Sequence, residues 1–237
     1  MNGVVSLLDN RHYEMVEQLW ADLEREFDVR GVYVTPYPHF SYQIAPRYDV
    51  EALEAVLQRF ASKSRPFRVG TSGLAIFTGP SPVLYIPVVR TLELTRFHEA
   101  LWQEISQAGS EIVGYYHPER WMPHITIGMG DLNKDNLGRI VQYLSGRDFY
   151  WEITVDNLAF IYDTGTEQVL RSRFDFGSEV TRNKARQGRP VTQETIERLN
   201  RLREQIAREN KGGPFEDSTE LLRQQREERT RELMGDL

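Results

Sequence analysis

Two short motifs constrain this chain more than any other feature: Pro38-His39-Phe40-Ser41 and Pro123-His124-Ile125-Thr126. Each places a histidine two residues before a hydroxyl, inside a run that alternates like a β-strand. Side chains two positions apart on a strand point to the same face, so each motif presents an imidazole and a hydroxyl side by side. A fold that brings the two strands together would line one cleft with two proton-transfer groups and two hydroxyls.

Two imidazoles and two hydroxyls suit phosphoryl transfer without a metal. One imidazole can remove a proton from the attacking oxygen while the other protonates the leaving oxygen. The hydroxyls can hold the non-bridging phosphate oxygens. A single histidine on a strand is usually a structural residue whose ring bonds a neighbouring carbonyl. The matching pairs, His39 with Ser41 and His124 with Thr126, favour catalysis over that alternative.

Signatures of other chemistries are missing from the sequence. There is no His-Glu-x-x-His pattern, and His, Ser and Thr alone do not make a usual zinc shell, so no metal site is expected. A Gly-Lys-Ser/Thr phosphate loop is also missing, which leaves ATP-dependent chemistry without support. Cysteine does not occur, which rules out disulfides and thiolate nucleophiles. We therefore expect no cofactor.

Charge and aromatic content divide the chain near Gly177-Ser178. Residues 1–177 hold 16 Lys and Arg against 23 Asp and Glu, a net charge of −7, while residues 178–237 hold 13 against 12, a net charge of +1. Phe215 is the only aromatic residue after the boundary. The acidic first part argues against non-specific binding of long nucleic acid, which needs many cationic contacts. We predict one domain over 1–177 and a charged helical tail over 178–237, with a linker at 178–190.

The N-terminal sequence shows no targeting signal. Its apolar stretch has no basic residues before it and is too short for a signal peptide. No window of the sequence approaches the roughly 18 apolar residues of a membrane span. We expect a soluble cytoplasmic protein that has no membrane partner.

Hydrophobic periodicity predicts alternating helices and strands over the first 177 residues. Helices are expected at 10–27, 49–62, 91–107 and 133–144, and strands at 4–8, 37–45, 67–77, 83–89, 125–129, 150–155, 158–162 and 170–176. A motif strand followed by a helix and a strand pair occurs twice, and several links are too short for parallel crossovers. This order predicts an α+β fold of two similar lobes with mostly antiparallel strands.

The paired His-x-Ser/Thr motifs, with the segments 65–77 and 83–88 between them, resemble the 2H phosphoesterase superfamily, which includes 2′-5′ RNA ligases and 2′,3′-cyclic phosphodiesterases. The similarity covers residues 1–177. It implies a bilobal, pseudo-twofold fold whose antiparallel sheets line a central cleft for a phosphodiester. His39 and His124 then match the catalytic histidines, and Ser41 and Thr126 match the phosphate-binding hydroxyls. Ser41 replaces the commoner threonine and keeps the hydroxyl.

The resemblance implies a metal-independent phosphoesterase acting on a 2′,3′-cyclic phosphate or a 2′-5′ phosphodiester of RNA ends or nucleotides. Hydrolysis and ligation both fit, and the sequence does not assign acid and base between the two histidines. The first alternative is a non-catalytic nucleotide or RNA-end binder on the same scaffold. The second is a protein-interaction module that acts through the C-terminal tail.

Six further residues are candidates for substrate contact. In the loop before the second motif, Tyr116 or Trp121 could stack on a base, Arg120 could pair with a phosphate, and His117 would lie at the mouth of the cleft. An ordinary loop anchored by its aromatic residues is an equal alternative. On the last predicted strand, Arg171 and Arg173 could reach substrate phosphate, although solvated charges at a sheet edge are more common.

Two more histidines are expected to have no part in the site. His12 lies near the start of the first predicted helix, where we expect it to be solvated. His98 lies off the apolar stripe of its helix, formed by Leu101 and Ile105, so we expect it to be exposed.

The tail is predicted to form two helices, from Thr192 to about Asn210 and over 218–234. Their apolar stripes are too narrow to bury a core of their own. The segment 215–223 is similar to the C-terminal arms of small bacterial antitoxins, which wrap a toxin partner. We therefore expect residues 190–237 to bind a protein partner or to self-associate, with a solvated extension as the alternative.

Overall fold

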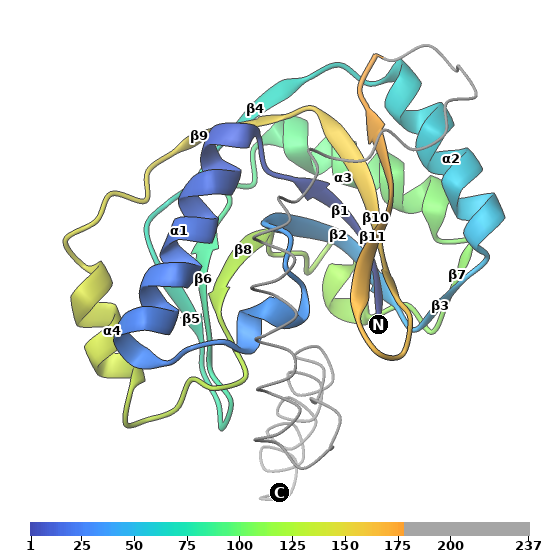
Figure 1. The fold of residues 1–237 in the computed structure, drawn as a ribbon. Coiled ribbons are helices and arrows are strands. Elements are labelled where there is room, and N and C mark those ends of the chain that lie inside the picture. The colour runs from blue at the N-terminus through green and yellow to red at the C-terminus, as the bar shows by residue number, and fades with distance from the viewer. Residues whose placement is uncertain (178–237) are drawn as a thin grey trace, which may run out of the picture.

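A computed structural model describes residues 1–177 of the chain (Figure 1). It contains a four-stranded sheet in the order β11 (Gln168–Asp175), β10 (Asn157–Asp163), β1 (Asn2–Leu7), β2 (His39–Ala45), and a three-stranded sheet in the order β5 (Ala75–Phe77), β6 (Val83–Pro87), β8 (His124–Gly128). Two shorter pairs join β4 (Phe67–Gly70) to β9 (Glu152–Val155) and β3 (Arg47–Tyr48) to β7 (Gly109–Ser110). The helices are α1 (Asn10–Phe27), α2 (Val50–Lys63), α3 (Leu92–Ile105) and α4 (Leu137–Leu144), with short 3₁₀ turns η1 (Gly31–Val34) and η2 (Gly114–Tyr116).

All strand pairings of residues 1–177 are antiparallel, and the fold is the expected α+β type. Three helices begin where a side chain caps the first turn: Asp9 accepts from a backbone N–H of α1, Asp49 from one of α2, and Thr91 from one of α3. Each of these helices buries one apolar face, such as Leu19 and Leu23 of α1. Local sequence therefore determines where these helices begin and which face they bury.

The two halves of the fold exchange elements. The first half runs β1-α1-β2-α2-β4-β5, and the second repeats this order as β6-α3-β8-α4-β9-β10. The motif histidines lie 85 positions apart, and so do the first residues of β4 and β9. However, β5 pairs with β6 of the second half, whereas β10 pairs with β1 of the first. In the same way α1 packs against β8 and α3 packs against β2 (Figure 1).

This exchange modifies the repeat that periodicity predicts. The predicted repeat begins at the motif strand, whereas the structural repeat begins one strand and one helix earlier. The predicted strand pair after each motif is also divided, because β4 and β9 pair with each other instead of with their neighbours in sequence. Two lobes facing each other are therefore present, but neither is a continuous segment of chain.

Two predicted elements differ from the structure by more than two residues at an end or in number, whereas the others agree to within two residues. The single strand expected at 67–77 is two strands, because the chain turns at Gly73, whose φ of +76° favours glycine. The helix expected from Asn133 begins at Leu137 instead. The Asn133 side chain accepts hydrogen bonds from the backbone N–H groups of Asp135 and Asn136, which forms a turn in place of the first helical residues.

The predictions for the tail, including its linker, two helices and protein partner, fall on residues that lie outside the described part of the chain. Among the helices within residues 1–177, none combines the length and apolar character that a membrane span requires.

Candidate active site

The two motif strands meet at the boundary between the sheets. β2 is the last strand of the four-stranded sheet and β8 is the last strand of the three-stranded sheet. The two strands lie side by side without forming a ladder with each other (Figure 1). Along both, the histidine and the hydroxyl residue are partly exposed, while the residue between them, Phe40 or Ile125, is buried. The alternation thus directs both His/hydroxyl pairs away from the core.

The two motif histidines are held in the same way. Nδ1 of His39 lies 2.5 Å from the carbonyl oxygen of Tyr37, and Nδ1 of His124 lies 2.7 Å from that of Met122. Each acceptor lies two residues before its histidine. Since a carbonyl can only accept, Nδ1 carries the proton in the neutral ring and Nε2 carries the lone pair. Both rings therefore have Nε2 ready to accept a proton, or to donate one when protonated.

Burial lowers the pKa of both histidines. For His39, burial is the main cause and the pKa falls to about 4; the bond to Tyr37 opposes this shift, and charge on His124 adds to it. Burial likewise lowers the pKa of His124, against the opposing bond to Met122. The effect of His124 on His39 means that the two rings interact electrostatically across the boundary between the sheets. The neutral form of each ring is favoured in the unliganded protein.

Aromatic side chains that the sequence analysis did not single out pack against His124. Its ring centroid lies 5.1 Å from that of Phe77 and 5.2 Å from that of Tyr85, and these two aromatic rings stack at 4.1 Å. Tyr85 is the cross-strand partner of Thr126, so both side chains face the same side of the sheet. Burial also raises the pKa of the Tyr85 hydroxyl. The sequence of β6 is a continuous apolar run, so it contains no alternation that would have singled out Tyr85.

The His39 side has an aliphatic cluster with Tyr37 packed against it. Val5, Leu7, Ala159 and Ile161 form a small buried cluster on the four-stranded sheet. Leu7 is the cross-strand partner of His39, so the histidine borders this cluster. The two histidines therefore share a backbone anchor but differ in the side chains around them.

The loop before the second motif places its tryptophan in the core, where the sequence analysis expected a residue that could stack on a base. Trp121 is 2% exposed, and its indole N–H donates to the carbonyl of Ser41 over 2.8 Å, which leaves it within the core and not on the surface. Tyr116 packs partly buried against the core. His117 and Arg120 are exposed, and the His117 ring lies edge-on to Trp102 with centroids 5.5 Å apart. Roles of Tyr116, His117 and Arg120 in binding stay predictions.

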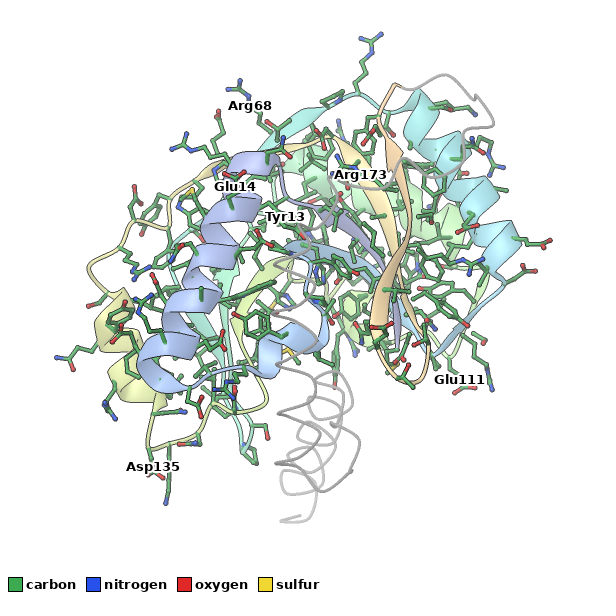
Figure 2. The ribbon with its side chains drawn as sticks, in the orientation of Figure 1. Tyr13, Glu14, Arg68, Glu111, Asp135 and Arg173 are labelled. Carbon is green, nitrogen blue, oxygen red and sulfur yellow. The ribbon has the colours of Figure 1, made fainter. Side chains whose placement is uncertain are left out.

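The two arginines of β11 both bond to carboxylates. Arg171 pairs with Glu54 of α2, on the helix-covered side of the sheet. Arg173 pairs with Asp175 over 2.8 Å and with Asp156 over 3.7 Å, and it lies near Tyr13 (Figure 2). In the register of the four-stranded sheet, Arg173 lies opposite Ala159, Ala159 opposite Val5 and Val5 opposite Ser41, so Arg173 is in the same cross-strand row as the first motif hydroxyl. Roles of Arg171 and Arg173 in binding stay predictions.

The expectations for the other two histidines were wrong. His12 is 6% exposed, because its Nδ1 bonds the helix-capping carboxylate of Asp9 and its ring packs on Trp151. His98 is 1% exposed, since α3 turns it toward β2, where Nε2 bonds the carbonyl of Tyr42. In both cases a specific polar partner allows a histidine to enter the core, which helical periodicity does not reveal.

Among residues 1–177, no group of three or more His, Asp or Glu side chains is arranged to hold a metal ion. The motif side chains instead supply two imidazoles and two hydroxyls. Such a set can transfer protons and donate hydrogen bonds to an oxyanion.

Fold, paired histidines and hydroxyls define a two-histidine phosphoesterase architecture, and comparison with known proteins agrees with it. The chain belongs to the 2′-5′ RNA ligase superfamily, whose family model matches residues 9–167. It is 27% identical over 161 residues to a Bacillus cytotoxicus protein provisionally named a phosphoesterase, covering 65% of this chain and 86% of the relative. A Geobacillus kaustophilus protein with the same provisional name is 24% identical over 139 residues, covering 58% and 76%.

The crystal structure of the Thermus thermophilus protein TT0787 has a similar fold, with a TM-score of 0.54 and 18% sequence identity. The match covers 75% of this chain and 98% of that protein. Together these relationships support an enzyme of the 2H phosphoesterase type, with a phosphoesterase- or ligase-like function.

Proposed function

We propose that the protein is a metal-independent phosphoesterase acting on a 2′,3′-cyclic phosphate or a 2′-5′ phosphodiester of RNA ends or nucleotides. The observation that carries the proposal is the matched setting of His39 and His124. Each ring is anchored through Nδ1 to a backbone carbonyl, each has a lowered pKa, and each has a hydroxyl two residues later on the same strand. Such a pair can serve as base and acid for one phosphate.

The reaction follows from these groups. In hydrolysis of a cyclic phosphate, the neutral imidazole takes a proton from water as the water oxygen bonds to phosphorus. The bond between phosphorus and one ribose oxygen breaks, and the protonated imidazole donates its proton to that oxygen. Hydroxyls of Ser41 and Thr126 donate hydrogen bonds to the non-bridging oxygens, whose charge grows in the transition state. Ligation is the same sequence with a ribose hydroxyl in place of water: the hydroxyl oxygen bonds to phosphorus as the neutral imidazole takes its proton, one ring P–O bond of the cyclic phosphate breaks, and the protonated imidazole donates its proton to the released ribose oxygen.

An anionic substrate also provides the required protonation state. In the free protein, burial favours two neutral rings, whereas the reaction needs one neutral and one charged ring. A phosphate between the rings favours the charged form of its neighbours and raises their pKa. Substrate binding would thus generate the protonated imidazole that acts as the acid.

The test is hydrolysis of 2′,3′-cyclic nucleotides and of a cyclic-phosphate-ended oligoribonucleotide in EDTA. Replacing either motif histidine, as His39→Ala or His124→Ala, should lower the rate by on the order of 10²–10⁴. His12→Ala is the matched control, because His12 contacts Asp9 and Trp151 and neither motif. Loss of turnover in EDTA by the wild type, or equal losses in all three variants, would contradict the proposal. Binding of these nucleotides without turnover would favour the non-catalytic alternative.

A further inference from the structure

The first motif strand contains an irregularity directly after its hydroxyl residue. In the pairing of β2 with β1, Ser41 lies opposite Val5 and Gln43 lies opposite Val4. Tyr42 is therefore an extra residue that has no register partner in β1, as in a β-bulge. Bulges change the direction of the neighbouring side chain and are frequent beside active sites.

The second motif strand has the same irregularity at the matching place. In the pairing of β8 with β6, Thr126 lies opposite Tyr85 and Gly128 lies opposite Leu84. Ile127, the residue directly after the hydroxyl residue, is again without a partner. Two irregularities at equivalent positions indicate that the direction of each hydroxyl depends on a local distortion of its strand.

A tryptophan indole bonds each distorted strand at the carbonyl of the hydroxyl residue itself. The N–H of Trp121 donates to the carbonyl of Ser41 over 2.8 Å, and that of Trp20 donates to the carbonyl of Thr126 over 3.2 Å. Both tryptophans are at least nine-tenths buried. Since β2 and β8 end their sheets, ladder bonds hold each strand from one side only, and a buried indole bond adds a fixed point on the backbone.

Two further side chains, His98 and Arg90, hold Trp121 in place for its hydrogen bond to Ser41. The His98 ring lies 3.8 Å from the Trp121 ring and donates from Nε2 to the carbonyl of Tyr42, the bulged residue. The guanidinium of Arg90 donates to the backbone carbonyl of Trp121. Consecutive carbonyls of β2 thus accept hydrogen bonds from two aromatic rings that pack against each other.

Each indole donates its hydrogen bond to the other half of the fold. Trp20 is on α1 of the first half and bonds the second motif, whereas Trp121 directly precedes the second motif and bonds the first. We infer that Trp20 and Trp121 are positioning residues that hold the two bulges and thereby direct the hydroxyls of Ser41 and Thr126 at one phosphate. The inference rests on the proposed function for what the directed hydroxyls do.

The test replaces each indole by phenylalanine, which keeps an aromatic ring and removes the N–H. Trp151→Phe is the matched control, because the Trp151 indole donates to the carbonyl of Asp148 over 2.9 Å, away from both motifs. For a 2′,3′-cyclic nucleotide, Trp20→Phe and Trp121→Phe should lower kcat by about tenfold while KM changes by less than about threefold. Trp151→Phe should change neither by more than about twofold. Thermal unfolding of all three should shift by similar amounts.

A purely structural role would lower stability in all three variants and leave kcat of the folded protein alike, which would overturn the inference. Inorganic phosphate, titrated into the same samples, separates this result from failure of the proposed function. If the wild type shows no turnover, the proposed function fails, and the inference then stands only if phosphate affinity falls at least about threefold in Trp20→Phe and Trp121→Phe relative to Trp151→Phe. Equal phosphate affinities in that case would overturn it.

Discussion

The imidazole of His98 lies against the indole of Trp121, with ring centroids 3.8 Å apart and a tilt of 32°. The pair connects α3 to the first motif strand through two hydrogen bonds to consecutive carbonyls. Nδ1 of His98 is buried and has no hydrogen-bond partner among residues 1–177. Burial lowers the pKa of His98 to about 4, with positive charge on Arg90 and His117 adding to the shift and the Tyr42 carbonyl opposing it.

The buried His98 predicts that the protein loses stability in weak acid. The unfolded chain takes up a proton at His98 near pH 6.5, whereas the folded chain does so only near pH 4. The contribution of neutral His98 to the free energy of unfolding is therefore complete above pH 6.5 and is lost as the pH falls through 4. His98→Gln keeps an N–H donor for Tyr42 and does not titrate. Urea unfolding at pH 7, 6 and 5 should show a steeper loss in the wild type, and parallel curves would contradict the prediction.

The pH dependence of the reaction follows from the lowered pKa values of both motif histidines. In the proposed mechanism the active free enzyme has one neutral and one protonated ring, a state that forms mainly below pH 6.5 because burial lowers the pKa of His39 and of His124. We expect kcat/KM to decline above that pH. In kcat, the alkaline limb should lie at higher pH, since bound phosphate raises the pKa of the acid. Profiles from pH 4 to 8 that show the same alkaline limb for both parameters would contradict this expectation.

Activity should depend on a hydroxyl at position 41 more than on whether serine or threonine supplies it. Ser41→Ala removes the hydroxyl that we propose donates to a non-bridging oxygen, and it should lower kcat by about 10- to 1,000-fold. Ser41→Thr restores the hydroxyl, with the β-branched side chain that the second motif already uses at Thr126, and should remain within about tenfold of the wild type. Steady-state kinetics on one cyclic nucleotide checks both. Equal activity of the two variants would exclude a role for the hydroxyl.

Close backbone packing at Gly31 predicts a stability effect outside the site. A Cβ at this position would lie 1.9 Å from the backbone oxygen of Met129, so Gly31→Ala should destabilise the protein by about 1–3 kcal/mol. Gly138→Ala is the control, because a Cβ there meets nothing within 4 Å and alanine favours a helix. Chemical denaturation should show opposite shifts for the two variants. If Gly31→Ala left the free energy of unfolding unchanged, the loop would be able to move away from Met129.

Local sequence predicted the elements well and their partners less well. The expected bounds of α1 agree with the structure because Asp9 caps one end and an apolar stripe continues to the other. Strand periodicity also predicted which residues of each motif point away from the core. Neither signal tells which strand pairs with which, so the exchange of β5 and β10 between the halves could not be predicted.

The same limit explains Trp121. Its position in a polar loop before the second motif suggested a base-stacking surface, but its partner, the Ser41 carbonyl, is 80 positions away in sequence. When the acceptor of a hydrogen bond lies far away in the sequence, the residues around the donor show no pattern that indicates the bond. His98 was misjudged for the same reason, since its acceptor lies on β2 and not on its own helix. The side chains that hold the site from behind are thus harder to find in the sequence than those that face it.

The place of β1 has a consequence for synthesis. Within residues 1–177, β1 leaves the ribosome before every other strand, yet it lies between β2 and β10 and needs both as partners. Residues up to Asp163, the end of β10, must therefore emerge before β1 can form its hydrogen bonds on both sides. The segment VVSL of β1 therefore stays unpaired on one side until β10 has been made, so this segment is where a chaperone would be expected to bind the nascent chain.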